Sequence, residues 1–122
     1  KPNMVISGKK AANRASPQVV AEATLRTLKR RVPPAVPGIA FLSGGQSSTE
    51  ATLHLSLMNR MGPLPWSLTF SYGRALQDTA LKAWGGNAAT FAAGQKEFAR
   101  RARLNGLATS GRYNPEMESQ AA

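Results

Sequence analysis

The chain has 122 residues, enough for one modest domain with its own core, and an apolar content of 42% excludes wholesale disorder. Without cysteine, and with His54 as the single histidine, disulfides, thiolate catalysis and a conventional zinc site are excluded, so we expect no metal and no cofactor. The formal net charge of +10 predicts an anionic partner. The sequence contains no run of eighteen apolar residues, so we predict no membrane span.

The first predicted helix begins at Pro17. Ser16 suits an N-cap, and proline is favoured at the first helical position. Apolar residues at helical spacing then define one face: Ala21, Leu25, Leu28 and Val32. The proline pair at 33–34 ends the helix.

Two strand–turn–helix units follow. Residues 38–42 and 66–70 are short and largely apolar, as buried parallel strands are. After the first strand come a Gly-Gly turn and a helix, for which Ser47 and Glu50 have the spacing of a capping box. After the second strand, a turn at 71–73 leads into a helix that begins at Arg74.

The remaining sequence predicts a helix over 88–108, with Phe91, Phe98, Ala102 and Leu107 as its apolar residues, and a flexible tail over 111–122. Alternating strands and helices predict an α/β fold with a parallel sheet. Residues 1–110 would form part of a single domain. A chain that opens on lysine and has so few strands is expected to begin inside a longer protein.

The two glycine turns occupy matching positions after consecutive strands, where backbone N–H groups at a helix start can hold a phosphate. Arg74 strengthens this interpretation because the helix dipole disfavours a cation in a first turn, so an anion is expected beside it. An arginine that reaches solvent or a nearby carboxylate is the alternative. Lys1 precedes proline, which favours extended backbone and the end of a strand at the same rim. A solvated terminal lysine is the alternative there.

The acidic residues lie within predicted helices or the tail, and none follows a strand. A lysine nucleophile needs a partner that moves protons. The segment therefore either lacks the chemistry or receives its acid and base from elsewhere. His54 is expected to be a partly exposed helix residue.

With these residues the chain resembles the C-terminal third of the class I fructose-1,6-bisphosphate aldolases. The matching stretches, in order, are KPNMV from Lys1, PPAVxG from Pro33, FLSGGQS from Phe41, LTFSYGRALQ from Leu68 and ALKAWGG from Ala80. The resemblance implies the last strand–helix units of a (β/α)8 TIM barrel, followed by a C-terminal helix and tail. It also implies a homotetramer.

The resemblance assigns roles to seven residues. Lys1 matches the lysine that forms a Schiff base with the substrate ketone. Two groups match a phosphate site after the last two strands: Ser43, Gly44 and Gly45, and then Ser71, Gly73 and Arg74. The implied reaction cleaves fructose 1,6-bisphosphate to dihydroxyacetone phosphate and glyceraldehyde 3-phosphate.

Two other hypotheses stay open. The basic charge also suits a nucleic-acid-binding module, although its clusters are short and no recognition motif accompanies them. A catalytically incomplete fragment is the other. The stretch after Met4 and the basicity are similar to trypanosomatid aldolases, which reside in glycosomes, so the resemblance implies a cytoplasmic or glycosomal location.

Overall fold

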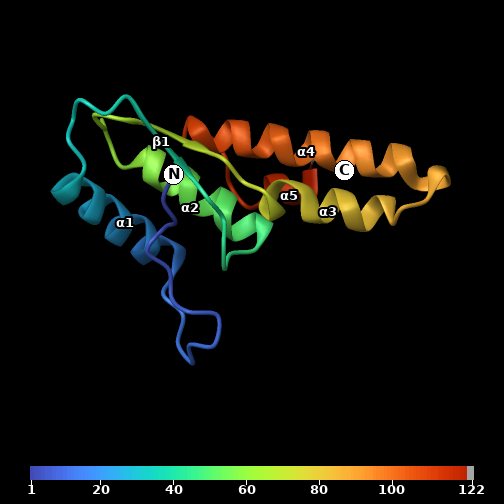
Figure 1. Cartoon of the computed structure of the whole chain (residues 1–122), viewed down its shortest axis with the longest axis horizontal. Coiled ribbons are helices and arrows are strands. Elements are labelled where there is room, and N and C mark those ends of the chain that lie inside the picture. The colour runs from blue at the N-terminus through green and yellow to red at the C-terminus, as the bar shows by residue number, and fades with distance from the viewer. Residues whose placement is uncertain (121–122) are drawn as a thin grey trace.

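The computed structural model describes residues 1–120. Its helices and strands are α1 (Pro17–Arg31), β1 (Gly38–Phe41), α2 (Ser48–Arg60), β2 (Ser67–Phe70), α3 (Arg74–Trp84), the 3-10 turn η1 (Ala88–Thr90), α4 (Phe91–Thr109) and α5 (Met117–Gln120). The expected order of strands and helices is therefore confirmed (Figure 1).

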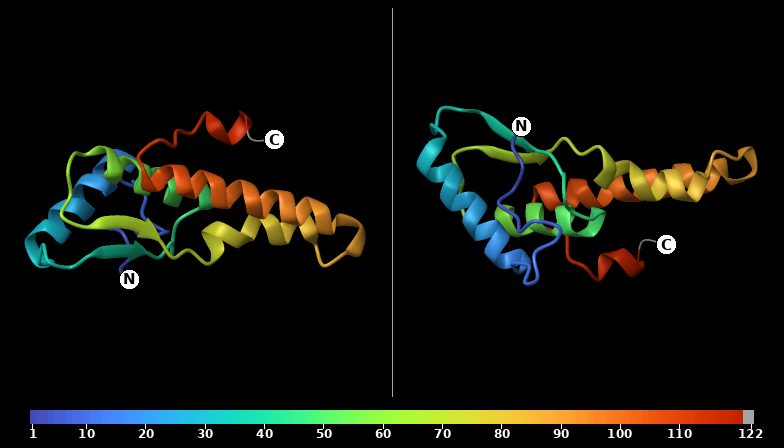
Figure 2. Two further views of the ribbon diagram at one scale, coloured as in Figure 1. Left: turned by 90° about the horizontal axis from the view of Figure 1, so that it is seen from above. Right: turned by 60° about the horizontal axis from the view of Figure 1, so that its bottom comes forward.

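The strands β1 and β2 pair in parallel, with Ile39 opposite Leu68 and Phe41 opposite Phe70. Ile39, Phe41 and Leu68 are buried, because they face the helices, whereas the alternate residues are more exposed. In Figure 2 (right) α1 and α2 lie on one side of the strands, and no element of residues 1–120 covers the other side. The sheet thus has one packed face and one open face.

The N-terminal segment runs along the free side of β1, outside the two-stranded sheet. The N–H of Leu42 donates to the carbonyl of Pro2 at 3.0 Å, while Phe41 bonds on its other side to the N–H of Ser71 at 2.8 Å. Lys1 lies beside the start of β1, and the amide of Asn3 reaches the carbonyl of Gly44 beyond its end. The segment therefore runs parallel to β1.

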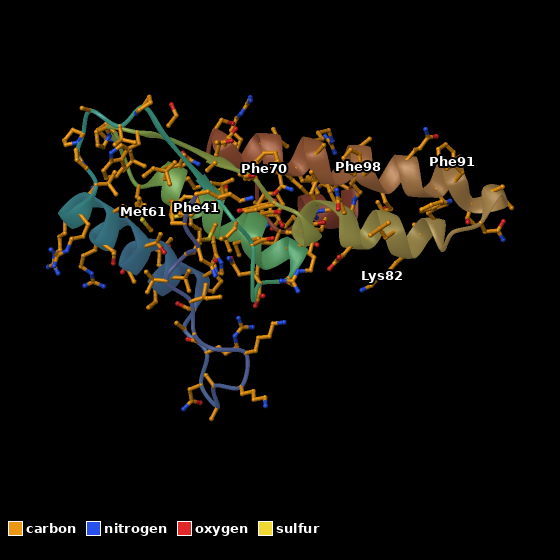
Figure 3. The ribbon with its side chains drawn as sticks, viewed as in Figure 1. Phe41, Met61, Phe70, Lys82, Phe91 and Phe98 are labelled. Carbon is orange, nitrogen blue, oxygen red and sulfur yellow. The ribbon has the colours of Figure 1, made fainter. Side chains whose placement is uncertain are left out.

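The core lies between the sheet and the helices. The predicted face of α1 is confirmed, since Ala21, Leu25 and Leu28 are buried. On α2 the capping box of Ser47 and Glu50 is present, and the apolar stripe has no exposed surface: Ala51, Leu55 and Met58. Phe41 reaches this core from β1 (Figure 3).

Helices α3 and α4 form a hairpin that projects from the body of the molecule (Figure 1). Two of the apolar residues of α4, Phe91 and Phe98, are 54% and 44% exposed. They lie along the hairpin, next to an open apolar groove that Leu81 and Trp84 also line (Figure 3). The residues of α4 that enter the core are Leu104 and Ala108, and Arg101 beside them is also buried, with 1% of its surface exposed.

The segment after Gly111, which the sequence predicted to be a flexible tail, packs against the body as far as Gln120. Tyr113 is fully buried, and its hydroxyl donates to Glu118 at 2.8 Å. Glu118 also accepts from Arg100 and Arg101 of α4. Residues 121 and 122, the end of the predicted tail, lie outside the described part. No helix within residues 1–120 is long and apolar enough to cross a membrane.

Candidate active site

The loop after β1 begins with Ser43, which is buried, and continues through Gly44 and Gly45. Gly45 has φ of 78°, which L-residues rarely adopt, and a Cβ there would lie 3.0 Å from Cδ1 of Ile6. Glycine is needed at this position because both the backbone and the space exclude a side chain.

The loop after β2 is anchored by Tyr72, whose hydroxyl donates to the carbonyl of Ala51 at 2.8 Å. Burial raises the pKa of this phenol, so it stays protonated and keeps donating. Gly73 then takes the N-cap position of α3 and supplies no side-chain cap. The start of α3 is therefore left to backbone N–H groups, beside an exposed Arg74.

Arg74 forms no ion pair within residues 1–120, so the alternative of a nearby carboxylate partner finds no support there. Its guanidinium stands at the positive end of a helix, where the dipole repels it. Such a position is favourable when an anion binds between the cation and the helix start. The start of α3 has the chemistry of a phosphate site.

Free N–H groups also mark the first loop. Ser43 uses its carbonyl to accept from the N–H of Gln46 at 3.1 Å, and Gly44 uses its carbonyl to accept from Asn3 at 3.0 Å. The N–H groups of Gly44 and Gly45 have no hydrogen-bond partner among residues 1–120. Since adjacent parallel strands end at the same edge of a sheet, both loops offer donors on one side of the molecule.

Lys1 lies beside β1, below this rim, and lines a pocket together with Leu28 of α1 and Val32. In a parallel ladder, the bond from Leu42 to Pro2 places Asn3 opposite Leu42 and Lys1 opposite Ala40. The expectation that Lys1 ends a strand is not met, because residues 1–16 form no strand. Lys1 lies about 10 Å below the level of Ser43 at ~3.3 Å per residue. Its four-carbon side chain is exposed and bonds to neither loop within residues 1–120.

Three polar side chains that the sequence analysis did not assign to the site connect the N-terminal segment to the first loop: Asn3, Gln46 and His54. Nε2 of Gln46 donates to Oδ1 of Asn3 at 3.1 Å, and Oε1 of Gln46 lies 2.7 Å from Nδ1 of His54. The expectation that His54 is partly exposed was wrong, because only 4% of it is exposed. The residues next to His54 in the sequence did not indicate that it would bond to Gln46.

Burial lowers the pKa of His54, although the carboxylate of Glu50 opposes this effect. Glu50 itself has a lowered pKa, chiefly because its carboxylate accepts a hydrogen bond from the N–H of Ser47. Arg14, on the loop before α1, pairs with Glu50 at 3.1 Å. This carboxylate is thus held in a structural role at the start of α2.

The remaining acidic residues lie in helices or near the C-terminus, as expected: Glu22, Asp78, Glu97, Glu116 and Glu118. None follows a strand. The site within residues 1–120 therefore contains an amine, an arginine and free backbone N–H groups, and no carboxylate at a strand end. No group of three or more metal-binding side chains occurs in the described residues.

Parallel strands that alternate with helices, with glycine loops at their carboxyl edge, are typical of part of a (β/α)8 barrel. The family model for class-I fructose-bisphosphate aldolase matches residues 1–122. The chain belongs to that family, and the resemblance seen in its motifs is confirmed.

Relatives and a solved structure agree with this membership. The chain is 54% identical to the muscle-type fructose-bisphosphate aldolase of Lethenteron camtschaticum and 53% identical to the chloroplastic fructose-bisphosphate aldolase 1 of Arabidopsis thaliana. All of the chain aligns, with 34% of the first relative and 30% of the second.

The structure of fructose-bisphosphate aldolase from Plasmodium falciparum, in complex with TRAP and a small-molecule inhibitor, superposes with a TM-score of 0.88 at 49% identity. The match covers 93% of this chain and 33% of that one. The chain thus spans about a third of its relatives, and its fold is the corresponding part of the TIM barrel.

Proposed function

We propose that this chain supplies the Schiff-base lysine and a phosphate site of a class I fructose-bisphosphate aldolase. Lys1 is the nucleophile. Ser43, Gly44 and Gly45, with Ser71, Gly73 and Arg74, bind one phosphate of the substrate. The two groups share a carboxyl edge, as the register of β1 and β2 requires.

The chemistry begins when the neutral amine of Lys1 attacks the ketone carbon, and loss of water gives an iminium ion. The iminium accepts the electron pair released when the C3–C4 bond breaks, while the C4 hydroxyl loses its proton and leaves as the aldehyde of glyceraldehyde 3-phosphate. Protonation of the resulting enamine and hydrolysis then release dihydroxyacetone phosphate. The phosphate site holds the ketone carbon within reach of the amine.

The observation that carries the proposal is that two groups of backbone N–H donors near the segment that bears Lys1, one in each loop, lack a protein partner in the described part of the chain. The N–H groups of Gly44 and Gly45 have no partner in residues 1–120, and α3 lacks a side-chain cap at Gly73. Leu42 bonds directly to the segment that bears Lys1. An anion bound at the rim would thus lie about three residues above Lys1 along β1.

The test uses the chain joined to the remaining two thirds of a family barrel, called the complete barrel below. Borohydride reduction in the presence of dihydroxyacetone phosphate should give a covalent adduct on Lys1, located by peptide mass spectrometry. Lys82, exposed on α3, is the matched control: Lys1→Met should abolish the adduct, and Lys82→Met should not. An adduct on a different lysine would contradict the proposal.

The isolated chain is proposed to be catalytically incomplete, because it holds no carboxylate at a strand end to move protons. The nucleic-acid alternative gains no support from the fold, since Arg60, Arg100 and Arg101 are engaged with carbonyl or carboxylate oxygens. Homotetramer assembly and a cytoplasmic or glycosomal location rest on the resemblance and remain predictions. Gel filtration of the complete barrel tests the assembly.

A further inference from the structure

We propose that Asn3, Gln46 and His54 are positioning residues that orient the phosphate-binding loop relative to the segment that bears Lys1. The inference rests on the proposed function, which it deepens. None of the three side chains is assigned a chemical step, and each acts through the backbone of the loop at Ser43–Gly45.

The hydrogen-bond directions in this cluster are all determined. Oε1 of Gln46 can only accept, so His54 must carry a proton on Nδ1 to make its bond of 2.7 Å. Nε2 of Gln46 then donates to Oδ1 of Asn3, which also accepts from the N–H of Met4 at 2.9 Å. With Oδ1 occupied in this way, Nδ2 of Asn3 donates to the carbonyl of Gly44.

This chain of bonds ends on the loop that is proposed to bind phosphate. A peptide unit is planar and trans, so the direction of a carbonyl determines that of the N–H on the same unit. The bond from Asn3 to the Gly44 carbonyl sets the N–H of Gly45. The backbone bond from Gln46 to the Ser43 carbonyl sets the N–H of Gly44 in the same way.

Gln46 is the junction of these effects. Its backbone bonds to Ser43, and its side chain links Asn3, two residues after Lys1, to the buried His54 of α2. The peptide units Ser43–Gly44 and Gly44–Gly45 are held by the bonds from Gln46 and Asn3. The loop is therefore oriented by α2 on one side and by the N-terminal segment on the other, before any anion binds.

His54 gives the sharpest test, because its packing and its hydrogen bond can be separated. Leucine fills the buried space but cannot donate, whereas the amide nitrogen of asparagine can occupy nearly the position of Nδ1. In the complete barrel, His54→Leu should weaken inorganic phosphate binding by about 2- to 10-fold, the effect of one neutral hydrogen bond. His54→Asn should stay within about 2-fold of the parent.

A second pair checks the junction itself. Gln46→Met keeps the length of the side chain and removes both of its bonds, and should weaken phosphate binding as His54→Leu does. Gln95→Met makes the same change on an exposed position of α4 and should have no effect. Phosphate affinity is measured by calorimetry, and borohydride trapping at saturating dihydroxyacetone phosphate shows that each variant folds.

The outcomes separate the two proposals. Equal weakening by His54→Leu and His54→Asn, or no weakening by Gln46→Met, overturns the positioning role. If the parent protein forms no adduct on Lys1, the proposed function fails. A loss of phosphate affinity confined to His54→Leu and Gln46→Met would then still support the positioning role.

Discussion

Arg101 of α4 and Glu118 of α5 form a close ion pair, in which Nη1 of Arg101 lies 2.7 Å from Oε1 and 2.8 Å from Oε2 of the carboxylate. Only 1% of the arginine side chain and 19% of the glutamate side chain are exposed. Arg101 also donates to the carbonyl of Ser48 at the start of α2, at 3.0 Å. A buried guanidinium thus joins the C-terminal segment to α2, the helix that follows the loop at Ser43–Gly45.

Removing this carboxylate should be costly, because it leaves the guanidinium buried without its counter-charge. In the complete barrel, Glu118→Gln is expected to lower the free energy of unfolding by about 3 kcal/mol. Urea denaturation measures the change. Glu116→Gln, an exposed position of the same segment, is the control and should alter stability little. Equal effects of both variants would contradict the structural role of the pair.

Gly45→Ala should damage the first loop in two ways. A left-handed φ costs an L-residue about 1 to 2 kcal/mol, and the new methyl group would press on Ile6. We expect lower stability together with weaker phosphate binding. Gly62→Ala separates the effects, because Gly62 has φ of 95° with open space around it. It should lower stability by a similar backbone cost and leave phosphate affinity unchanged, as denaturation and calorimetry would show.

The buried His54 makes stability depend on pH. Its folded pKa lies below the ordinary value of 6.5, so the unfolded chain takes up a proton first as the pH falls. Stability should therefore be full above about pH 6.5 and decline below it. Glu50 acts in a lower window, since its lowered pKa adds stability above its ordinary value of 4.5 that is lost on further acidification.

Comparing unfolding free energies at about pH 7.5 and about pH 5.5 isolates the histidine. The parent protein should lose more stability between these values than His54→Asn, which has no group that titrates there. Arg14 and Glu50 are the charged groups that act on His54. The lowered pKa of Glu50 keeps its carboxylate ionised across this range. Identical losses in the two proteins would refute the assignment.

Arg74→Gln should raise the KM for a phosphorylated ketose by about 10- to 100-fold, the effect of one hydrogen bond to a charged group. The arginine has no ion-pair partner in residues 1–120, so its removal should hardly change stability. Arg112→Gln is the matched control, on an exposed arginine of the C-terminal segment. Steady-state kinetics of the complete barrel decide, and an unchanged KM would count against the phosphate role.

Local signals in the sequence were sufficient to predict the helices and strands and their order along the chain. Ser16 before Pro17, the capping-box spacing of Ser47 and Glu50, and the glycine pair after Trp84 marked helix ends that the structure confirms. The motifs also identified the family. These features act within a few residues of each other, so no knowledge of the tertiary fold was needed to interpret them.

The burial or exposure of Phe91, Arg101 and His54 could not be predicted from the sequence. Phe91 is apolar yet exposed, while Arg101 and His54 are polar yet buried. Their burial depends on partners distant in sequence, such as Glu118 for Arg101, and residue type at one position carries no information about such partners. Periodicity located α4, but it did not show which of its residues are buried.

By itself the sequence determined the strand–turn–helix units, the helix ends and the membership of an aldolase family. Helix caps, glycine turns and short sequence motifs each involve residues that are close together in the chain. Only the tertiary structure decided that Lys1 lies beside β1, below the rim, and that Gln46 bonds to both Asn3 and His54. Strand register and side-chain hydrogen bonds join residues some forty positions apart, so they are set by how the packed elements meet.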